Sequence, residues 1–154
     1  MRLAALFLPC LVLAGASCQR VTERGNNTPS AISLVPDASL RETRWVLRQV
    51  SGQPVPEAAS PGQEPYMFIS AAGTAEGQGG CNRFRAGLKP ATDDGELQFA
   101  PLLSTRMACP AIKTENEFTR ALAQSRTYRI SGDTLRLFDA TNAPVARLEA
   151  VYLH

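Results

Sequence analysis

Two cysteines and the residues around them constrain this chain more than any other feature. Cys81 lies in the glycine-rich segment GQGGCNRF at 77–84, and Cys109 lies in the segment STRMACP at 104–110. The clustered glycines predict a bulge or a tight bend, because glycine adopts backbone angles that other residues avoid. No helical periodicity follows these glycines, so they do not open a helix as a phosphate-binding loop does. We interpret the stretch from Gly77 to Pro110 as the centre of a β-rich fold.

The first residues have the layout of a secretory leader. Arg2 precedes an apolar run from Leu3 to Leu13, and small residues follow at 14–17. The run is shorter than the about 20 apolar residues that a membrane-spanning helix needs. We therefore expect a signal peptide at 1–17.

The residue that follows this leader predicts how the chain is anchored. The small residues before Cys18 are similar to a bacterial lipobox, although Gly15 stands where leucine is usual. Acylation of Cys18 would anchor the protein in a membrane through its lipid. Gln19 in place of aspartate favours the outer membrane, with the protein facing the periplasm, by resemblance to enterobacterial sorting rules. The alternative is cleavage after Ala16, which would give a soluble periplasmic protein.

Export also decides what the remaining cysteines do. Cys10 leaves with the leader and Cys18 carries lipid, so Cys81 and Cys109 form an even pair in an oxidising compartment. A disulfide between them would close a loop of about 30 residues and contribute about 3–4 kcal/mol in a chain-entropy model. The alternatives are a metal pair or a redox pair. Both lack support, because the sequence has no C-x-x-C motif and its one histidine is His154. We expect no metal and no other cofactor.

A polar segment separates the leader from the folded part. Residues 18–40 are rich in Ser, Thr, Asn and Pro and show no sustained periodicity. Such a composition buries too little apolar area to offset the entropy of ordering, so we expect a flexible tether. The folded domain is predicted at 41–154.

Within the folded domain, short β-rich segments alternate with turns around a single helix. Strands are expected at 43–50, 66–70, 74–77, 84–88, 96–100, 127–130, 134–138 and 145–153. Thr114-x-x-Glu117 matches a capping box at the start of the helix. The buried face of this helix is predicted to carry Phe118, Ala121, Leu122 and Ser125. Trp45 is expected to anchor the core. This pattern predicts an α+β fold, with a small antiparallel curved sheet or partly closed β-barrel and one packed helix.

Several of these segments together resemble a known family. The motifs GCNRF at 80–84 and STRMACP at 104–110, the helix near Phe118 and the later Tyr128-x-Ile130-x-Gly132 pattern are similar to the META domain of HslJ-like heat-shock lipoproteins. The resemblance covers about residues 40 to 153. One departure is Arg85-Ala86-Gly87, where many members carry a Ser-Gly pair. The resemblance implies a small barrel-like fold, an envelope location and roles linked to heat stress, novobiocin resistance or secretion. It implies no catalytic site.

Composition and motifs exclude several classes of function. A net charge of +2 is too small to indicate nucleic-acid binding. A nucleophile needs a base within hydrogen-bond reach, and the chain has neither a Gly-x-Ser-x-Gly elbow nor an internal histidine. Asp93 and Asp94 precede Gly95 and are interpreted as turn residues. We therefore expect no enzyme activity and no catalytic residues.

Two hypotheses for binding remain. Arg83 and Arg106 flank the two cysteines, and a disulfide would bring their guanidinium groups near one another as contacts for an anion or a partner. Alternatively, each satisfies loop carbonyls or a local acid. The favoured function is binding or support of an unknown envelope protein or lipid under stress. The alternative is a carrier of a small apolar or lipid ligand, in a barrel cavity lined by Phe68, Leu97, Phe99 and Leu137.

Overall fold

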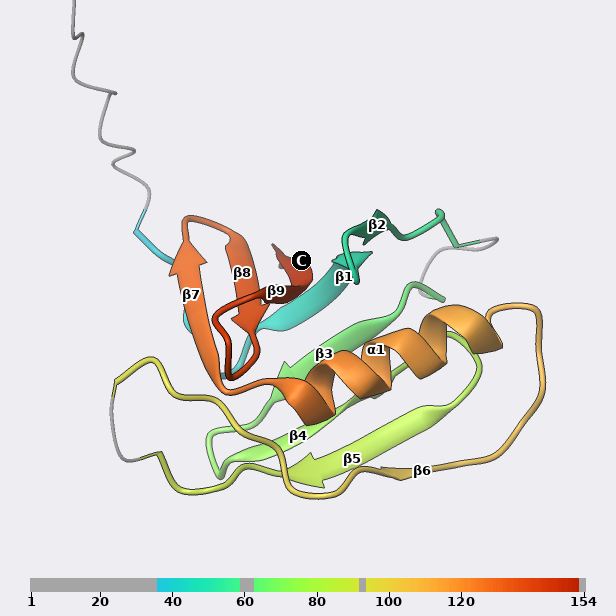
Figure 1. Cartoon of the computed structure of the whole chain (residues 1–154), viewed down its shortest axis with the longest axis horizontal. Helices are drawn as coiled ribbons and strands as arrows, with labels where there is room; N and C mark the ends of the chain where they lie inside the picture. Colours follow the sequence, from blue (N-terminus) through green and yellow to red (C-terminus); the bar gives the residue numbers. More distant parts are fainter. Residues whose placement is uncertain (1–35, 59–62, 92–93, 153–154) are drawn as a thin grey trace, which may run out of the picture. The chain divides into compact units, whose positions relative to one another are not determined.

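The predicted α+β class is confirmed by a computed structural model, which describes residues 36–58, 63–91 and 94–152 (Figure 1). The predicted leader and Cys18 lie outside these residues. The described part forms one helix and nine strands. The helix is α1 (Ile112–Gln124), and the strands are β1 (Arg44–Val50), β2 (Gln53–Pro54), β3 (Tyr66–Ile69), β4 (Thr74–Gln78), β5 (Arg83–Gly87), β6 (Leu103–Ser104), β7 (Thr127–Ser131), β8 (Thr134–Phe138) and β9 (Pro144–Val151).

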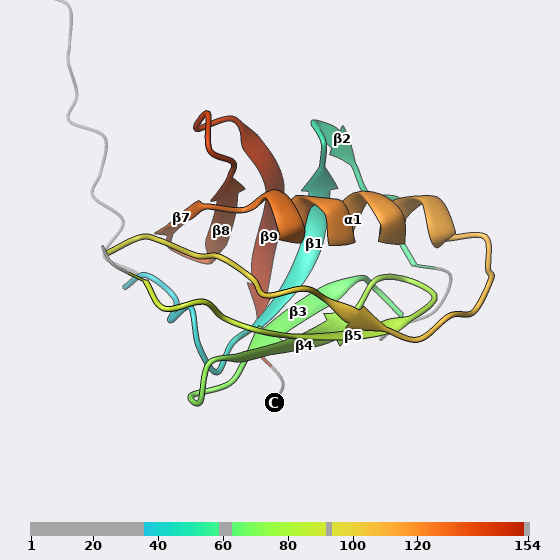
Figure 2. The same ribbon diagram turned by 60° about the horizontal axis from the view of Figure 1, so that its bottom comes forward.

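The strands form a single curved antiparallel sheet. Their order is β6-β5-β4-β3-β1-β9-β8-β7, and β2 pairs with β1 outside this path. The first and last long strands, β1 and β9, therefore lie side by side in the middle of the sheet. Helix α1 covers one face of the sheet and packs on β1, β8 and β9 (Figure 2).

The core lies between α1 and this face of the sheet. Trp45 on β1 is fully buried, and its indole Nε1–H donates to the carbonyl of Leu40 at 3.0 Å. Its predicted role as a core anchor is thus confirmed. The Phe118 ring meets the Phe84 ring edge-on, with 5.7 Å between the ring centroids. The predicted helix face is also confirmed, since all four of its residues are buried: Phe118, Ala121, Leu122 and Ser125.

The start of the helix differs from the prediction. Helix α1 begins at Ile112 and no side chain caps it, so the capping box predicted at Thr114 and Glu117 is wrong. Both of those residues lie inside the helix. The chain enters α1 through a turn in which the Ile112 amide donates to the carbonyl of Cys109 at 3.1 Å. A loop anchored by tertiary contacts therefore positions the first turn of the helix.

The strand pair predicted between 84–88 and 96–100 is only partly formed. Strand β5 pairs with β6 instead, and the later segment keeps one isolated bridge, between Leu88 and Phe99. The same segment also bridges to β7, through Glu96 and Thr127. The regular sheet is therefore open, and an irregular segment makes bridges to β7 and to the residue that follows β5.

The last residues of the predicted tether belong to the packed domain. Ala38 is buried, and its amide donates to the carbonyl of Gly132 at 3.0 Å. The Gly132 amide in turn donates to Asp37 Oδ1 at 2.7 Å. The chain therefore enters the domain at the turn between β7 and β8.

A second polar turn joins β8 to β9. Asp139 Oδ1 accepts the Thr141 hydroxyl at 2.7 Å, the Thr141 amide at 2.8 Å and the Ala143 amide at 3.0 Å. These bonds, above all the one from the Thr141 hydroxyl, favour the ionised form and lower the pKa of Asp139 below its ordinary value.

Candidate functional site

The two cysteines singled out by the sequence are joined in the structure. Cys81 lies in the hairpin between β4 and β5, and Cys109 lies just before α1. Their Cα atoms are 5.7 Å apart and their sulfur atoms form a disulfide. The disulfide predicted between Cys81 and Cys109 is therefore present in the structure. No group of three or more potential metal ligands occurs within the described residues.

A buried carboxylate on α1 holds the cysteine hairpin in place. Glu115 is 5% exposed, and its Oε2 accepts the amides of Cys81 at 2.9 Å and Asn82 at 2.6 Å. Its Oε1 accepts the Asn82 side-chain Nδ2–H at 2.7 Å. The carboxylate also lies in the first turn of α1, where it complements the positive end of the helix dipole. Glu115 thus connects the helix directly to the GCNRF motif.

Asn82 extends this connection to the second motif. Its Oδ1 accepts the Thr105 hydroxyl at 2.9 Å and the Met107 amide at 2.6 Å. Its Nδ2 also donates to the Met107 carbonyl at 3.0 Å. Asn82 is 2% exposed, so these bonds satisfy a side chain that would otherwise be costly to bury. The polar groups of both motifs therefore bind one another.

Two glycines allow the hairpin to approach the helix. A Cβ atom on Gly79 would lie 2.4 Å from Glu115 Cγ, which is far closer than packing allows. Gly80 has φ +129, a conformation that favours glycine, and a Cβ there would lie 3.0 Å from Ala111 Cβ. The tight bend predicted from the glycine-rich motif is therefore confirmed.

Sequence reasoning missed Glu115. A glutamate in the first turn of a helix is usually solvated, and nothing in its neighbours indicates burial. The available signal was the polar Asn82 between a cysteine and a buried strand, because a buried amide requires partners.

The pairing of Arg83 and Arg106 as contacts for an anion or a partner stays a prediction. Both are exposed, and neither guanidinium makes a hydrogen bond or ion pair with other described residues. Their backbones are near one another, since the Thr105 amide donates to the Arg83 carbonyl at 3.2 Å. Only Arg106, however, lines the groove beside α1. The idea that these arginines satisfy loop carbonyls or local acids is not supported within the described part.

This groove has a volume of about 540 Å³ and lies between α1 and the chain at 102–108. Asn82 and Glu115 contribute to its lining, and Arg106 lies along it. Met107 and Ile112 line the same groove and are 66% and 38% exposed. Leu103, on the neighbouring strand β6, is 74% exposed. The arrangement can bind an apolar group beside an anionic one.

The cavity considered for a lipid carrier is not formed. Leu97, Phe99 and Leu137 belong to the packed core and are at most 6% exposed. Phe68 lies on the opposite face of the sheet, in a surface pocket with Arg44 and other residues. The alternation of β3 places Met67 and Ile69 in the core and turns Phe68 away from it.

The fold and the two linked motifs define a small α+β domain that is crosslinked by the Cys81–Cys109 disulfide. The META domain family profile matches residues 38–152, and the chain belongs to this family. No curated protein matches the sequence.

Solved structures similar to this domain include one NMR structure and one crystal structure. An NMR structure of a protein from Burkholderia xenovorans is 27% identical, with a TM-score of 0.59, and the match covers 74% of this chain and 85% of that chain. A crystal structure of a DUF4847 family protein from Bacteroides vulgatus is 15% identical, with a TM-score of 0.53, and the match covers 72% and 94% of the two chains. The second likeness shows the fold alone.

Proposed function

We propose that this chain is a non-enzymatic envelope lipoprotein whose META domain binds another envelope component through the groove between β6 and α1. The observation that supports this most strongly is that some residues of the two motifs are buried and bonded to one another, whereas others face solvent. Asn82 and Glu115 bind each other and the backbone, whereas Met107 and Arg106 face solvent along the groove. Exposed apolar side chains beside a groove are typical of interaction sites.

The chemistry of the groove defines the partner. Met107 and Ile112 line the groove and offer apolar contact area, and the flexible thioether of Met107 adapts to different shapes. Arg106 has no partner among the described residues and offers a planar fork of donors for a carboxylate. We expect a protein segment that presents an apolar side chain next to an acidic one.

The location of the protein is part of the proposal. META-domain proteins are generally associated with the cell envelope, and the disulfide fits an oxidising compartment. No helix in the described ranges has the length and apolar character to cross a membrane. We propose cleavage after residue 17, acylation of Cys18 and a position on the outer membrane facing the periplasm. A soluble periplasmic form is the alternative.

Lipid labelling tests the anchor. Cells expressing the chain are grown with radioactive palmitate, and the protein is isolated and counted. We expect label in the natural chain and none in the Cys18→Ser variant. Absence of label in the natural chain would favour the soluble form cleaved after Ala16.

Crosslinking in cells tests the groove. A photo-reactive amino acid at position 107 is expected to capture one envelope protein, and Arg106→Glu is expected to abolish that capture. Position 140 provides the control, because Ala140 is also exposed but lies on the β8–β9 turn, away from the groove. The same captured protein at both positions would contradict the proposal.

A stress assay links the contact to function. Cells that lack the protein are complemented with the natural chain or with Arg106→Glu and are challenged by heat and by novobiocin. We expect Arg106→Glu to fold normally, since its guanidinium makes no contact to lose, and to fail in complementation. A variant that protects cells as well as the natural chain would show that the groove does not carry the function.

A further inference from the structure

Arginines form a row on the face of the sheet opposite α1. Arg129 on β7 pairs directly with Arg136 on β8, and Arg136 pairs directly with Arg147 on β9. We call these three residues the arginine ladder. Like charges directly opposite one another destabilise a sheet. Exposed strand positions accept threonine or glutamine, so the fold itself does not require cations here.

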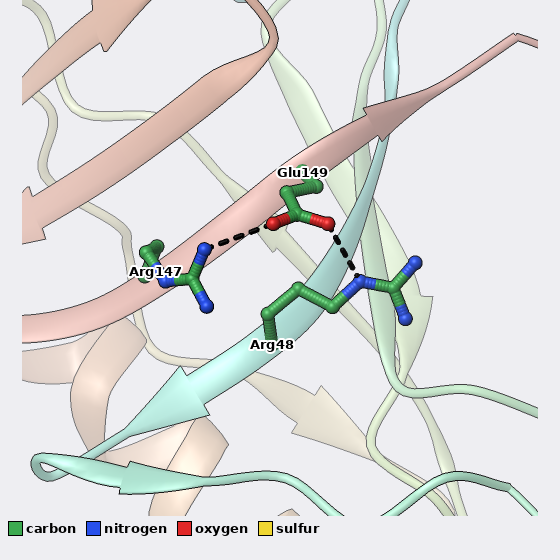
Figure 3. A network of polar contacts seen from close by, with 3 residues as sticks. All are labelled: Arg48, Arg147 and Glu149. Carbon is green, nitrogen blue, oxygen red and sulfur yellow. Dashed lines mark hydrogen bonds and ion pairs between the residues drawn. The ribbon is translucent and has the colours of Figure 1, made fainter.

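Little negative charge compensates the ladder. Glu149 binds Arg147 at 2.9 Å and Arg48 at 3.0 Å, so one carboxylate is shared by two guanidinium groups (Figure 3). Arg129 lies over the Phe138 ring at 4.8 Å and reaches Asn142 Oδ1 at 3.4 Å, neither of which carries charge.

The excess of positive charge is local. The three ladder arginines, Arg48 and Glu149 together carry +3, whereas the whole chain carries only +2. Glu57 and Glu64 share a pocket with Arg48 on the β1 side, and Asp37 and Asp133 lie at the β7–β8 turn, so the uncompensated charge is centred on Arg136 in the middle of the ladder. Arg136 has no hydrogen bond or ion pair with other described residues, although it lies in the middle of the ladder.

A shallow surface pocket of about 270 Å³ lies at the ladder. Arg136 and Arg147 line it, and Phe138 and Val145 contribute apolar surface between them. No acidic residue lines this pocket. Two planar guanidinium groups beside apolar surface suit a phosphate that is attached to an apolar or glycerol group.

The path of the chain points to a membrane as the source of such phosphates. Asp37 and Ala38 bind Gly132, so the chain enters the domain at the β7–β8 hairpin that carries Arg129 and Arg136. Cys18 is 19 residues before Asp37, and an extended chain of that length spans at most about 65 Å. An acylated Cys18 would therefore keep the ladder within reach of the surface of the bilayer.

We propose that the arginine ladder binds the anionic phosphate headgroups of the membrane in which the protein is anchored. This inference rests on the proposed envelope location but not on the groove between β6 and α1, which lies elsewhere on the domain. The lipid would provide the lasting attachment, and the ladder would orient the domain. Binding is expected to weaken with salt, because exposed charges are screened.

Vesicle sedimentation tests the proposal without the acyl chains. The chain from residue 18 to 154 with Cys18→Ser is mixed with vesicles of phosphatidylcholine alone or with added phosphatidylglycerol. We expect binding only to the anionic vesicles. Arg129→Gln, Arg136→Gln and Arg147→Gln combined should weaken it roughly a hundredfold, since each basic residue near an anionic surface contributes about fivefold. Arg136→Gln alone should weaken it about fivefold.

A matched variant controls for net charge. Arg85→Gln, Lys113→Gln and Arg120→Gln combined remove the same charge from exposed positions on β5 and α1. This control is expected to bind almost as the natural chain does. Equal losses in the two triple variants would show a general charge effect and overturn the proposal. Equal binding to both kinds of vesicle would also overturn it, as would full displacement by inorganic phosphate at matched ionic strength.

Discussion

Replacing Glu115 by alanine should be the most damaging single change in the candidate site. The carboxylate accepts three hydrogen bonds, from the amides of Cys81 and Asn82 and from the Asn82 side chain. Alanine removes every acceptor at once and leaves these donors in a buried space. The hairpin would lose its main polar connection to α1, although the disulfide would remain.

The magnitude follows from the burial of these donors. A buried donor without a partner costs about 1–3 kcal/mol, and bonds to a charged acceptor lie toward the upper end of the range. Two of the three bonds to Glu115 are fully buried, and the third is partly buried. We therefore expect Glu115→Ala to lower the free energy of unfolding by about 3–5 kcal/mol. Glu115→Gln keeps one acceptor oxygen and should cost about 1–3 kcal/mol.

Urea unfolding followed by the fluorescence of Trp45 measures this free energy, because Trp45 is the single tryptophan and is fully buried. Glu117→Ala is the matched control. It makes the same substitution two positions along α1, at a side chain that caps nothing. We expect a change of less than about 0.5 kcal/mol for this control. The reasoning fails if Glu115→Ala is as stable as the natural protein or if Glu117→Ala costs as much.

Two further predictions concern residues around this site, and a third concerns the β8–β9 turn. Replacing both disulfide cysteines by serine should lower the free energy of unfolding by about 3–4 kcal/mol, and a smaller loss on urea unfolding would contradict the chain-entropy account. Gly79→Ala should cost about 1–3 kcal/mol because its Cβ would meet the Glu115 side chain, whereas Gly87→Ala, which has open space around it, should be nearly neutral in the same assay. The hydrogen bond from the Thr141 hydroxyl lowers the pKa of Asp139 in the folded protein. The ionised Asp139 carboxylate therefore stabilises the fold above about pH 3.9, the ordinary pKa of aspartate, and this stabilisation is lost as the pH falls through the lowered pKa. Thermal unfolding midpoints should therefore fall less steeply below pH 4 in Asp139→Asn than in the natural protein, and parallel curves would contradict this assignment.

Much of the fold was predictable because its strands and helix carry strong local signals. Alternation in β9, the Gly132 turn and the helical spacing of Phe118 and Leu122 each depend on residues a few positions apart. The hairpin predicted at 84–88 and 96–100 formed only in part, because two neighbouring β-rich segments do not determine their partners. The segment at 96–100 and strand β6 can both pair with the free edge of β5, and the packing of the whole sheet decides that β6 does so.

The carrier cavity failed for a related reason. Hydrophobic side chains at Phe68 and Leu97 look alike in a sequence, but they lie on opposite faces of the sheet once the strands are paired. The prediction of a capping box was wrong because the Thr-x-x-Glu pattern does not by itself determine where a helix begins. The preceding turn at Cys109 starts α1 earlier, so that Ala111 rather than Thr114 occupies the N-cap position.

The amino-acid sequence alone determined the family resemblance, the cysteine pair and the glycine bend. It also determined the hydrophobic periodicity that is typical of strands and of a helix. All of these depend on residues that are close together in the chain. Tertiary structure alone decided the burial of Glu115 against Asn82, the separation of Arg83 from the groove and the alignment of Arg129, Arg136 and Arg147. The physical reason is register and packing. A hydrogen bond across 33 positions, or a row of charges across three strands, exists only after the sheet has brought distant segments together.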